Sequence, residues 1–208
     1  MKVVQQNCEA EIEVRGSRFL AQIIPIKGQE EARATLRVQK ERYADATHVV
    51  HAFISGNSGE VHGCSDDGEP SGTAGRPVLE VLKGSGLTNV LCTVTRWFGG
   101  TLLGTGGLVK AYTEAAKAVS QLAISEAEEL VELQKFSVIL PYDVYERFTR
   151  ELDEYGARIT ASEFTEAVSL NGMVPAIRAK ALSDRVVDIS SGRAQCRLSG
   201  DARSAIDS

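Results

Sequence analysis

The chain has 208 residues, of which 43% are hydrophobic and 25% are charged, and its formal net charge at pH 7 is −5. This composition excludes a disordered chain, and the length allows one large domain or two small ones. No apolar run is long enough to span a bilayer, and the first residues lack the apolar core of a signal peptide, so we expect a cytoplasmic protein without a membrane partner.

Strands and helices are predicted to alternate in the first part of the chain. Strands are read from alternating or β-branched apolar residues, and helices from apolar residues three or four positions apart. The near-continuous apolar run at 89–95 is typical of a central strand that is buried on both faces. The predicted strands are 11–14, 17–26, 47–55 and 89–95, and the predicted helices are 28–43, 77–82 and 107–123.

The last part of the chain follows a short acidic segment at 125–132 and has a recognisable order of elements. The predicted elements are a strand at 136–140, a helix at 142–155, strands at 158–164 and 167–174, a helix at 177–190 and a strand at 193–198. This βαββαβ order is the ferredoxin-like pattern. We therefore predict an α+β or α/β chain with two domains, 1–128 and 129–208.

Charge is distributed unevenly between these two parts. Residues 126–208 hold 15 Asp and Glu against 10 Lys and Arg, whereas residues 1–125 are balanced. An acidic protein is not expected to coat nucleic acid in general, but a local basic patch can still bind it.

Glycines concentrate in the middle of the chain. Thirteen of the 19 lie between Gly56 and Gly107, mostly in two segments, 63–77 and 96–112. Glycine permits a positive φ and a close approach of the backbone, at a cost in conformational entropy. Carboxylates, hydroxyls and basic residues share these two segments, so candidate functional residues are sought there.

The second segment places Gly104, Thr105, Gly106 and Gly107 before the predicted helix 107–123. Unpaired N–H groups at the start of a helix can bind phosphate or carboxylate, and Thr105 can cap such a helix. The spacing matches neither a Walker A loop nor GxGxxG. Anion binding and close backbone packing with capping therefore both stay open for this segment.

The first segment contains Asp66, Asp67 and Glu69 within four residues. Clustered carboxylates can hold a hard cation or supply a general base, and they can equally make the hydrogen bonds of turns and caps. The spacing is not that of a calcium loop. Arg76, Arg96 and Lys110 flank the two glycine-rich segments, so internal ion pairs are a further use for these carboxylates.

The residues do not indicate a metal or a cofactor, and we predict neither. His48 and His51 are three positions apart and would point to opposite faces of a strand, which makes a poor metal pair. The four cysteines form no CxxC pair and fit free thiols in a reducing compartment.

Two stretches, GCSDDGEPSGTAGRPV and RWFGGTLLGTGGLVKAY, closely resemble the YigZ/IMPACT family. The elements typical of the family fall on Ser65–Pro70 and Gly99–Gly107, and the resemblance extends over nearly the whole chain. It implies an N-terminal domain like domain 2 of a small-subunit ribosomal protein. It also implies a C-terminal ferredoxin-like domain resembling the last domain of elongation factor G. Members often carry a His-His-Cys run, of which only His48 is present here.

The same resemblance implies a binding protein rather than an enzyme. Relatives of both domains handle RNA and the ribosome, and eukaryotic members regulate translation, so the expected partner is RNA, the ribosome or a translation factor, with a phosphate or other anion at Gly104–Gly107. The alternative is a hydrolase of phosphate esters or nucleotides that uses Asp66, Asp67 and Glu69. A third interpretation is that these carboxylates only brace the fold. The predicted binding residues are Ser65, Asp66, Asp67, Glu69, Thr73, Arg76, Arg96, Gly99, Gly100, Gly104, Thr105, Gly106, Gly107 and Lys110.

Overall fold

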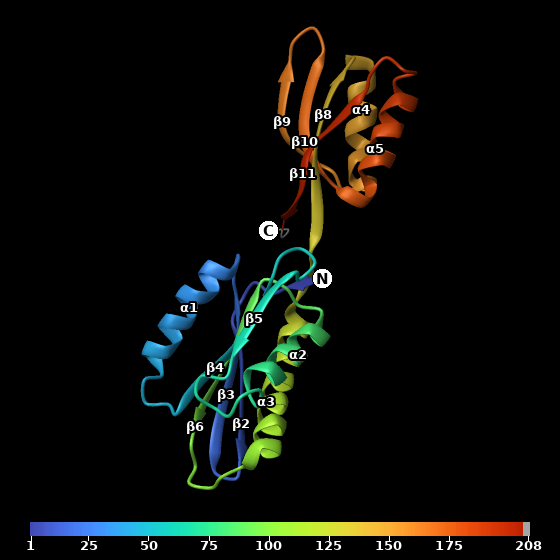
Figure 1. The fold of residues 1–208 in the computed structure, drawn as a ribbon. Coiled ribbons are helices and arrows are strands. Elements are labelled where there is room, and N and C mark those ends of the chain that lie inside the picture. The colour runs from blue at the N-terminus through green and yellow to red at the C-terminus, as the bar shows by residue number, and fades with distance from the viewer. Residues whose placement is uncertain (206–208) are drawn as a thin grey trace. The chain divides into compact units, whose positions relative to one another are not determined.

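Strands and helices alternate along residues 1–205, the part of the chain that the computed structural model describes (Figure 1). They form two units, Met1–Glu129 and Leu130–Ser208, which we call unit 1 and unit 2. Both units combine antiparallel sheets with helices, so the chain has a mixed α/β architecture. Within residues 1–205, no helix is long and apolar enough to cross a membrane.

Unit 1 is built on a five-stranded antiparallel sheet with helices on both faces. Helices α2 (Gly75–Ser85) and α3 (Gly104–Glu126) cover one face, and α1 (Gln29–Arg42) lies on the other (Figure 1). A separate pair of short strands, β1 (Lys2–Val3) and β7 (Glu128–Glu129), joins the two ends of the unit. The order in the large sheet is β2 (Cys8–Val14), β3 (Ser17–Pro25), β6 (Val90–Trp97), β4 (His48–Ser55) and β5 (Val61–Ser65).

The main core of unit 1 lies between the sheet and helices α2 and α3. Residues 90–96 of β6 are all buried, which confirms the central strand that the apolar run predicts. Helix α3 turns Leu108, Tyr112 and Val119 toward this core at helical spacing. The cover on the opposite face is thinner, because α1 buries only Ala32 and Gln39.

Unit 2 has the βαββαβ order of elements that the sequence predicts. Its four strands are antiparallel and lie in the order β11, β8, β10, β9, with both helices on one face of the sheet (Figure 1). Gly156 follows the first helical segment with a φ of +62°, a left-handed conformation that suits glycine at a helix end. The elements are β8 (Val131–Leu140), α4 (Tyr142–Glu151), the 3₁₀ turn η1 (Leu152–Tyr155), β9 (Arg158–Phe164), β10 (Val168–Pro175), α5 (Ala176–Ile189) and β11 (Cys196–Ala205).

The sequence pattern misses three short strands and misplaces two helix starts. Strand β5 is an edge strand without buried residues, so it lacks the apolar alternation by which strands are recognised, and β1 and β7 have two residues each. Helices α2 and α3 begin at Gly75 and Gly104, two and three residues before the predicted starts. Glycine reads as a loop residue in a sequence, although the first turn of a helix tolerates it.

An ion pair between α4 and α5 predicts that unit 2 loses stability in acid. Arg185 donates through Nε and Nη2 to both carboxylate oxygens of Glu151, at 2.6 and 2.8 Å, and Arg147 donates at 3.3 Å. The hydrogen bonds from Arg185, assisted by Arg147, lower the pKa of Glu151 from 4.5 to about 2. A carboxylate whose pKa is depressed by folding stabilises the fold above its unfolded pKa, and this stability is lost as the pH falls through the folded value.

We therefore expect the stability of unit 2 to fall between pH 4.5 and about 2 more steeply in the wild type than in Glu151→Gln. Denaturant titrations at several pH values, followed by NMR signals of unit 2, measure this difference. The control Glu146→Gln removes an exposed carboxylate 3.8 Å from Arg150 and should keep the wild-type pH dependence. Equal pH dependence in the wild type and Glu151→Gln would contradict the prediction.

Candidate functional site

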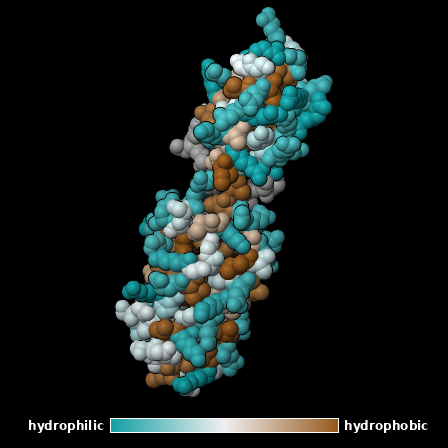
Figure 2. Space-filling model, turned by 90° about the vertical axis from the view of Figure 1, so that its right-hand side faces the viewer, coloured by the Kyte–Doolittle hydropathy of each residue, from teal (hydrophilic) through white to brown (hydrophobic). Residues whose placement is uncertain are grey.

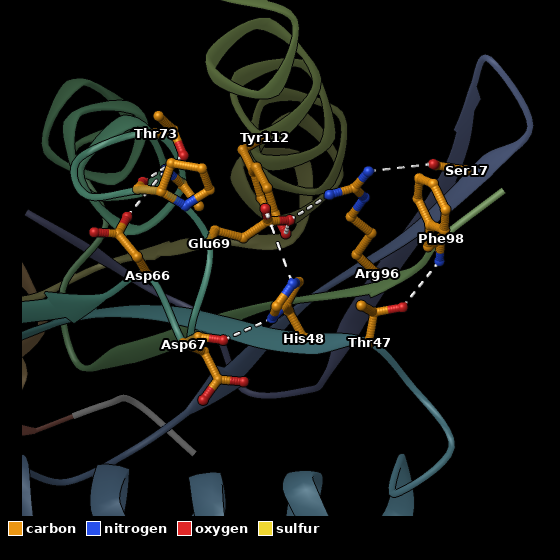
Figure 3. A network of polar contacts seen from close by, with 12 residues as sticks. Ser17, Thr47, His48, Asp66, Asp67, Glu69, Thr73, Arg96, Phe98 and Tyr112 are labelled. Carbon is orange, nitrogen blue, oxygen red and sulfur yellow. Dashed lines mark hydrogen bonds and ion pairs between the residues drawn. The ribbon is translucent and has the colours of Figure 1, made fainter. Parts of the chain in front are cut away.

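The loop between β5 and α2 directs its three carboxylates to three different parts of unit 1 (Figure 3). Asp66 reaches the start of α2, Asp67 reaches α1 and β4, and Glu69 reaches β6 and α3. We call this loop, residues 66–69, the acidic loop. The partners of each carboxylate decide what chemistry remains open to it.

Asp66 caps helix α2 from outside the helix. Its Oδ1 accepts hydrogen bonds from the backbone N–H groups of Ala74 and Gly75, at 3.0 and 2.8 Å, and its Oδ2 accepts one from Gly72 at 2.8 Å. Partial burial raises the pKa of Asp66, but the three N–H donors outweigh burial and the pKa lies below its usual range. The N–H groups of Ala74 and Gly75 are donors that a helix start leaves unpaired, so Asp66 acts as a cap, while Gly72 donates from the turn before the helix.

Asp67 ties helix α1 to strand β4. Its Oδ2 accepts a hydrogen bond from the backbone N–H of Val49 at 2.7 Å, and its Oδ1 forms an ion pair with Lys40 of α1. The backbone of Asp67 has a φ of +46°, and its N–H donates to Ser65 Oγ at 3.3 Å. Aspartate is among the few residues other than glycine that adopt this conformation readily, which fits its place in the turn.

Glu69 is the centre of a buried polar network, with a side chain that is only 3% exposed. Its Oε1 accepts hydrogen bonds from Arg96 Nη1 at 2.6 Å and from the Tyr112 hydroxyl at 2.8 Å. Burial, reinforced by the neighbouring Glu69 carboxylate, raises the pKa of Tyr112, so this phenol stays protonated and donates. A buried carboxylate with a cation and a phenol as partners is well satisfied.

His48 closes the network between Asp67 and Glu69 (Figure 3). Its Nδ1 lies 2.7 Å from the carbonyl oxygen of Asp67, and a carbonyl only accepts, so Nδ1 carries a hydrogen. Its Nε2 lies 3.9 Å from Glu69 Oε2. The imidazole is thereby oriented by backbone on one side and faces a carboxylate on the other.

The second glycine-rich segment packs against the turn between β2 and β3, at Gly16 and Ser17. Arg96 Nη2 donates to Ser17 Oγ at 3.4 Å, and the same oxygen accepts the backbone N–H of Gly99 at 3.1 Å. A Cβ at Gly99 would lie 1.9 Å from the carbonyl carbon of Gly16, so this glycine is required by the contact between two turns. Gly99 therefore serves close backbone packing, one of the two uses left open by the sequence.

The start of α3 differs from the prediction. The helix begins at Gly104 after Leu103, no side-chain hydrogen bond caps it, and Thr105 lies inside the first turn. Thr105 is therefore not the cap, because the helix starts before it. Gly104 and Gly106 are exposed, and Gly100 and Gly104 have φ values of +87° and +70° that favour glycine.

Of the predicted binding residues, the structure gathers one group and separates the rest. Arg76 is exposed on α2, and Lys110 is exposed on α3 with Glu114 at 3.9 Å, so neither pairs with the acidic loop as the flanking basic residues suggest. Three side chains that contact the loop were not predicted: Lys40, His48 and Tyr112. Ser17, also not predicted, contacts Arg96 and Gly99. Their positions depend on strand register and helix packing, which the motif alone does not reveal. The gathered residues are Ser65, Asp66, Asp67, Glu69, Thr73, Arg96 and Gly99.

In this arrangement the carboxylates of the acidic loop have little capacity left to bind a metal ion or to transfer a proton. Each of its three carboxylates already has two or more hydrogen-bond or ionic partners within the chain. Among residues 1–205, no group of three or more His, Cys, Asp and Glu side chains is placed to hold a metal ion. The geometry is that of a brace between helices and sheet.

A second candidate site is the sheet face of unit 2 that the helices leave open. Strand register places Ser137 between Asn171 and Arg197, and places Lys135 in the next row between Met173 and Ser199. A hollow of about 480 Å³ is lined by Ser137, Ser169, Asn171 and Arg197. This face is thus mixed: Lys135, Arg197 and Arg158 opposite Met173 are basic, whereas Glu163 opposite Ser169 is acidic. Ile139, which is 64% exposed, adds an apolar side chain that also lines the hollow.

Comparison with known proteins gives matches along most of the chain. Residues 15–120 match the family model described as "Impact N-terminal domain", and residues 138–193 match "Domain of unknown function (DUF1949)". The chain is 34% identical to "IMPACT family member YigZ" of Escherichia coli (strain K12), over 88% of this chain and 90% of that protein. It is 30% identical to "IMPACT family member YvyE" of Bacillus subtilis (strain 168), over 93% of this chain and 88% of that protein. A crystal structure described as that of "an hypothetical protein" matches with a TM-score of 0.63 and 29% identity, over 94% of this chain and 95% of that one.

Proposed function

The chain belongs to the IMPACT family, and from this premise we propose that it is a non-enzymatic binding protein that acts in translation by contacting ribosomal RNA. The proposal includes the resemblance of unit 1 to a ribosomal-protein domain and of unit 2 to the last domain of elongation factor G. Among the expected partners, RNA is favoured over a translation factor by the chemistry of the open sheet face of unit 2.

The observation that carries the proposal is the charge of this face. Unit 2 as a whole holds 12 Asp and Glu against 10 Lys and Arg, which would repel a polyanion. Its open sheet face nevertheless presents Lys135, Arg158 and Arg197 against one carboxylate, Glu163. Serine and asparagine side chains and the exposed Ile139 lie between these charges. Lysine and arginine contact phosphates, while serine and asparagine can bond to sugar hydroxyls and base edges.

The hydrolase alternative finds less support in unit 1. Asp66, Asp67 and Glu69 would have to release their internal partners before they could bind a metal or accept a proton from water. The exposed, uncapped start of α3 fits contact with a phosphate of the same RNA, as we expected for Gly104–Gly107.

We expect Lys135→Ala/Arg197→Ala to weaken binding to ribosomal RNA and to reduce its salt dependence. Two lost phosphate contacts should reduce the magnitude of the slope of log K against log salt by roughly 1.4 to 1.8. Fluorescence anisotropy with a labelled ribosomal RNA fragment, repeated at several salt concentrations, gives both quantities.

The matched control is Arg150→Ala/Lys180→Ala, which removes the same charges from exposed positions on α4 and α5. Its affinity and salt slope should stay near those of the wild type. If the two double variants behave alike, or if the wild type does not bind RNA at low salt, the proposal fails.

A further inference from the structure

A groove of about 730 Å³ lies between α2 and α3 on the surface of unit 1. Figure 2 views this side of the molecule, where apolar side chains are visible among hydrophilic ones. The apolar lining comes from Pro77 and Val81 of α2 and from Val109 and Ile124 of α3. Size and composition are those of pockets that hold small organic ligands, with apolar walls and a few polar groups.

Ser120 supplies a polar group in this groove without an internal partner. The residue is only 3% exposed, it lines the groove, and its hydroxyl makes no hydrogen bond to the described part of the chain. A serine inside a helix commonly bonds to the carbonyl four residues before it, and buried polar atoms are rarely left unpaired. The oxygen is itself buried, so Ser120 is an unpaired polar group in the wall of the groove and is not exposed within it.

Gly84, the second-last residue of α2, lines the groove near the C-terminal end of this helix. Glycine is unfavourable inside a helix, and a tight contact or a left-handed conformation usually explains it. Neither applies here, because a Cβ at Gly84 would meet nothing within 4 Å and its φ is not positive. The missing side chain leaves helix backbone open to whatever occupies the groove.

The charges that line the groove favour an anion. Arg76 of α2 and Lys117 of α3 are exposed, and neither forms an ion pair within residues 1–205. Glu80 of α2 also lines the groove, so its lining carries two cations and one carboxylate. An apolar body with one anionic group matches the lining in both polarity and sign.

We propose that the groove between α2 and α3 binds an organic anion with an apolar body, whose charge pairs with Arg76 and Lys117. This site is separate from the open sheet face of unit 2 on which the proposed function rests. Binding at one can therefore be lost while binding at the other persists.

The test uses a matched pair of fluorescent probes, anilinonaphthalene sulfonate and phenylnaphthylamine, which share an apolar body and an N–H group and differ in the sulfonate. Titration of the full chain should give saturable binding of the sulfonate, about tenfold tighter than that of the neutral probe. Arg76→Gln/Lys117→Gln should bring the two affinities together. Equal affinities in the wild type, or no saturable binding, would overturn the proposal.

Gly84→Leu locates the site, since it fills the groove while replacing glycine with a better helix former. Binding of the sulfonate should weaken by about tenfold or more, with cooperative unfolding retained. Lys83→Gln, a neighbouring exposed position on α2 outside the groove lining, is the control and should bind as the wild type does. Unchanged binding in a folded Gly84→Leu would show that the probe binds elsewhere, and the proposal would be wrong.

Discussion

Replacement of Glu69 by alanine is expected to lower the free energy of unfolding of unit 1 by about 3–5 kcal/mol. The change leaves the Arg96 guanidinium, whose side chain is 6% exposed, without the carboxylate 2.6 Å away. It also removes the acceptor of the Tyr112 hydroxyl, and Tyr112 is fully buried. Breaking a buried pair by removing one partner is costly because the other charge stays desolvated.

The single tryptophan, Trp97, lies in unit 1, so its fluorescence in a denaturant titration follows this unit separately from unit 2. Glu114→Ala is the control, because this exposed carboxylate on α3 forms a surface pair with Lys110 at 3.9 Å and should change stability by less than about 0.5 kcal/mol. The pair Glu69→Leu/Arg96→Met should regain part of the loss, since it leaves no unpaired charge. A loss below about 1 kcal/mol for Glu69→Ala would contradict the buried network.

The second large effect is expected for Asp66→Ala, at about 2–3 kcal/mol, because three backbone N–H groups at the start of α2 lose a charged acceptor. The folded pKa of Asp66 lies below its ordinary value of 3.8. Its stabilisation is therefore complete well above pH 3.8 and is lost as the pH falls through the folded pKa. The difference between wild type and variant should be constant from neutral pH down to about 5 and should shrink in stronger acid.

Denaturant titrations followed by Trp97 fluorescence at neutral and acid pH measure this difference. Glu41→Gln, an exposed carboxylate on α1, should show neither the loss nor the change with pH. If Asp66→Ala lost no more stability than this control, Asp66 would not act as a cap. A ligand-binding role for Asp66 would then be favoured.

The sequence predicts most helices and strands, because their apolar patterns are local. It does not predict contacts between residues that are far apart in the chain. The buried run of β6 and the six elements of unit 2 follow from periodicity and from glycine stops. From the sequence alone, the acidic loop can be interpreted either as a ligand site or as a brace. Nothing in Ser65–Pro70 shows that Arg96 and Tyr112 reach Glu69. Those two residues lie 27 and 43 positions away, and only the pairing of β6 and the packing of α3 bring them in.

In unit 2, the sequence likewise does not reveal how charge is distributed between the two faces of the sheet. A count along the sequence makes this part acidic, yet the register of β8, β10 and β11 sorts Lys135 and Arg197 onto one face of the sheet. Which face a side chain occupies depends on the parity of its position in a strand, and the start of β8 was predicted at residue 136 instead of Val131. Lys135 therefore lay outside the predicted strand.

The partners of the acidic loop also bear on the order in which unit 1 assembles. The side-chain contacts of Asp67 and Glu69 to β4, α1, β6 and α3 span between 18 and 43 positions in the sequence. Contacts that close long loops cost chain entropy before they contribute energy, so they tend to form late. Interactions absent from the transition state act mainly on the rate of unfolding. The loop should thus behave as a kinetic latch: its loss lets unit 1 open faster, while the rate of folding changes little.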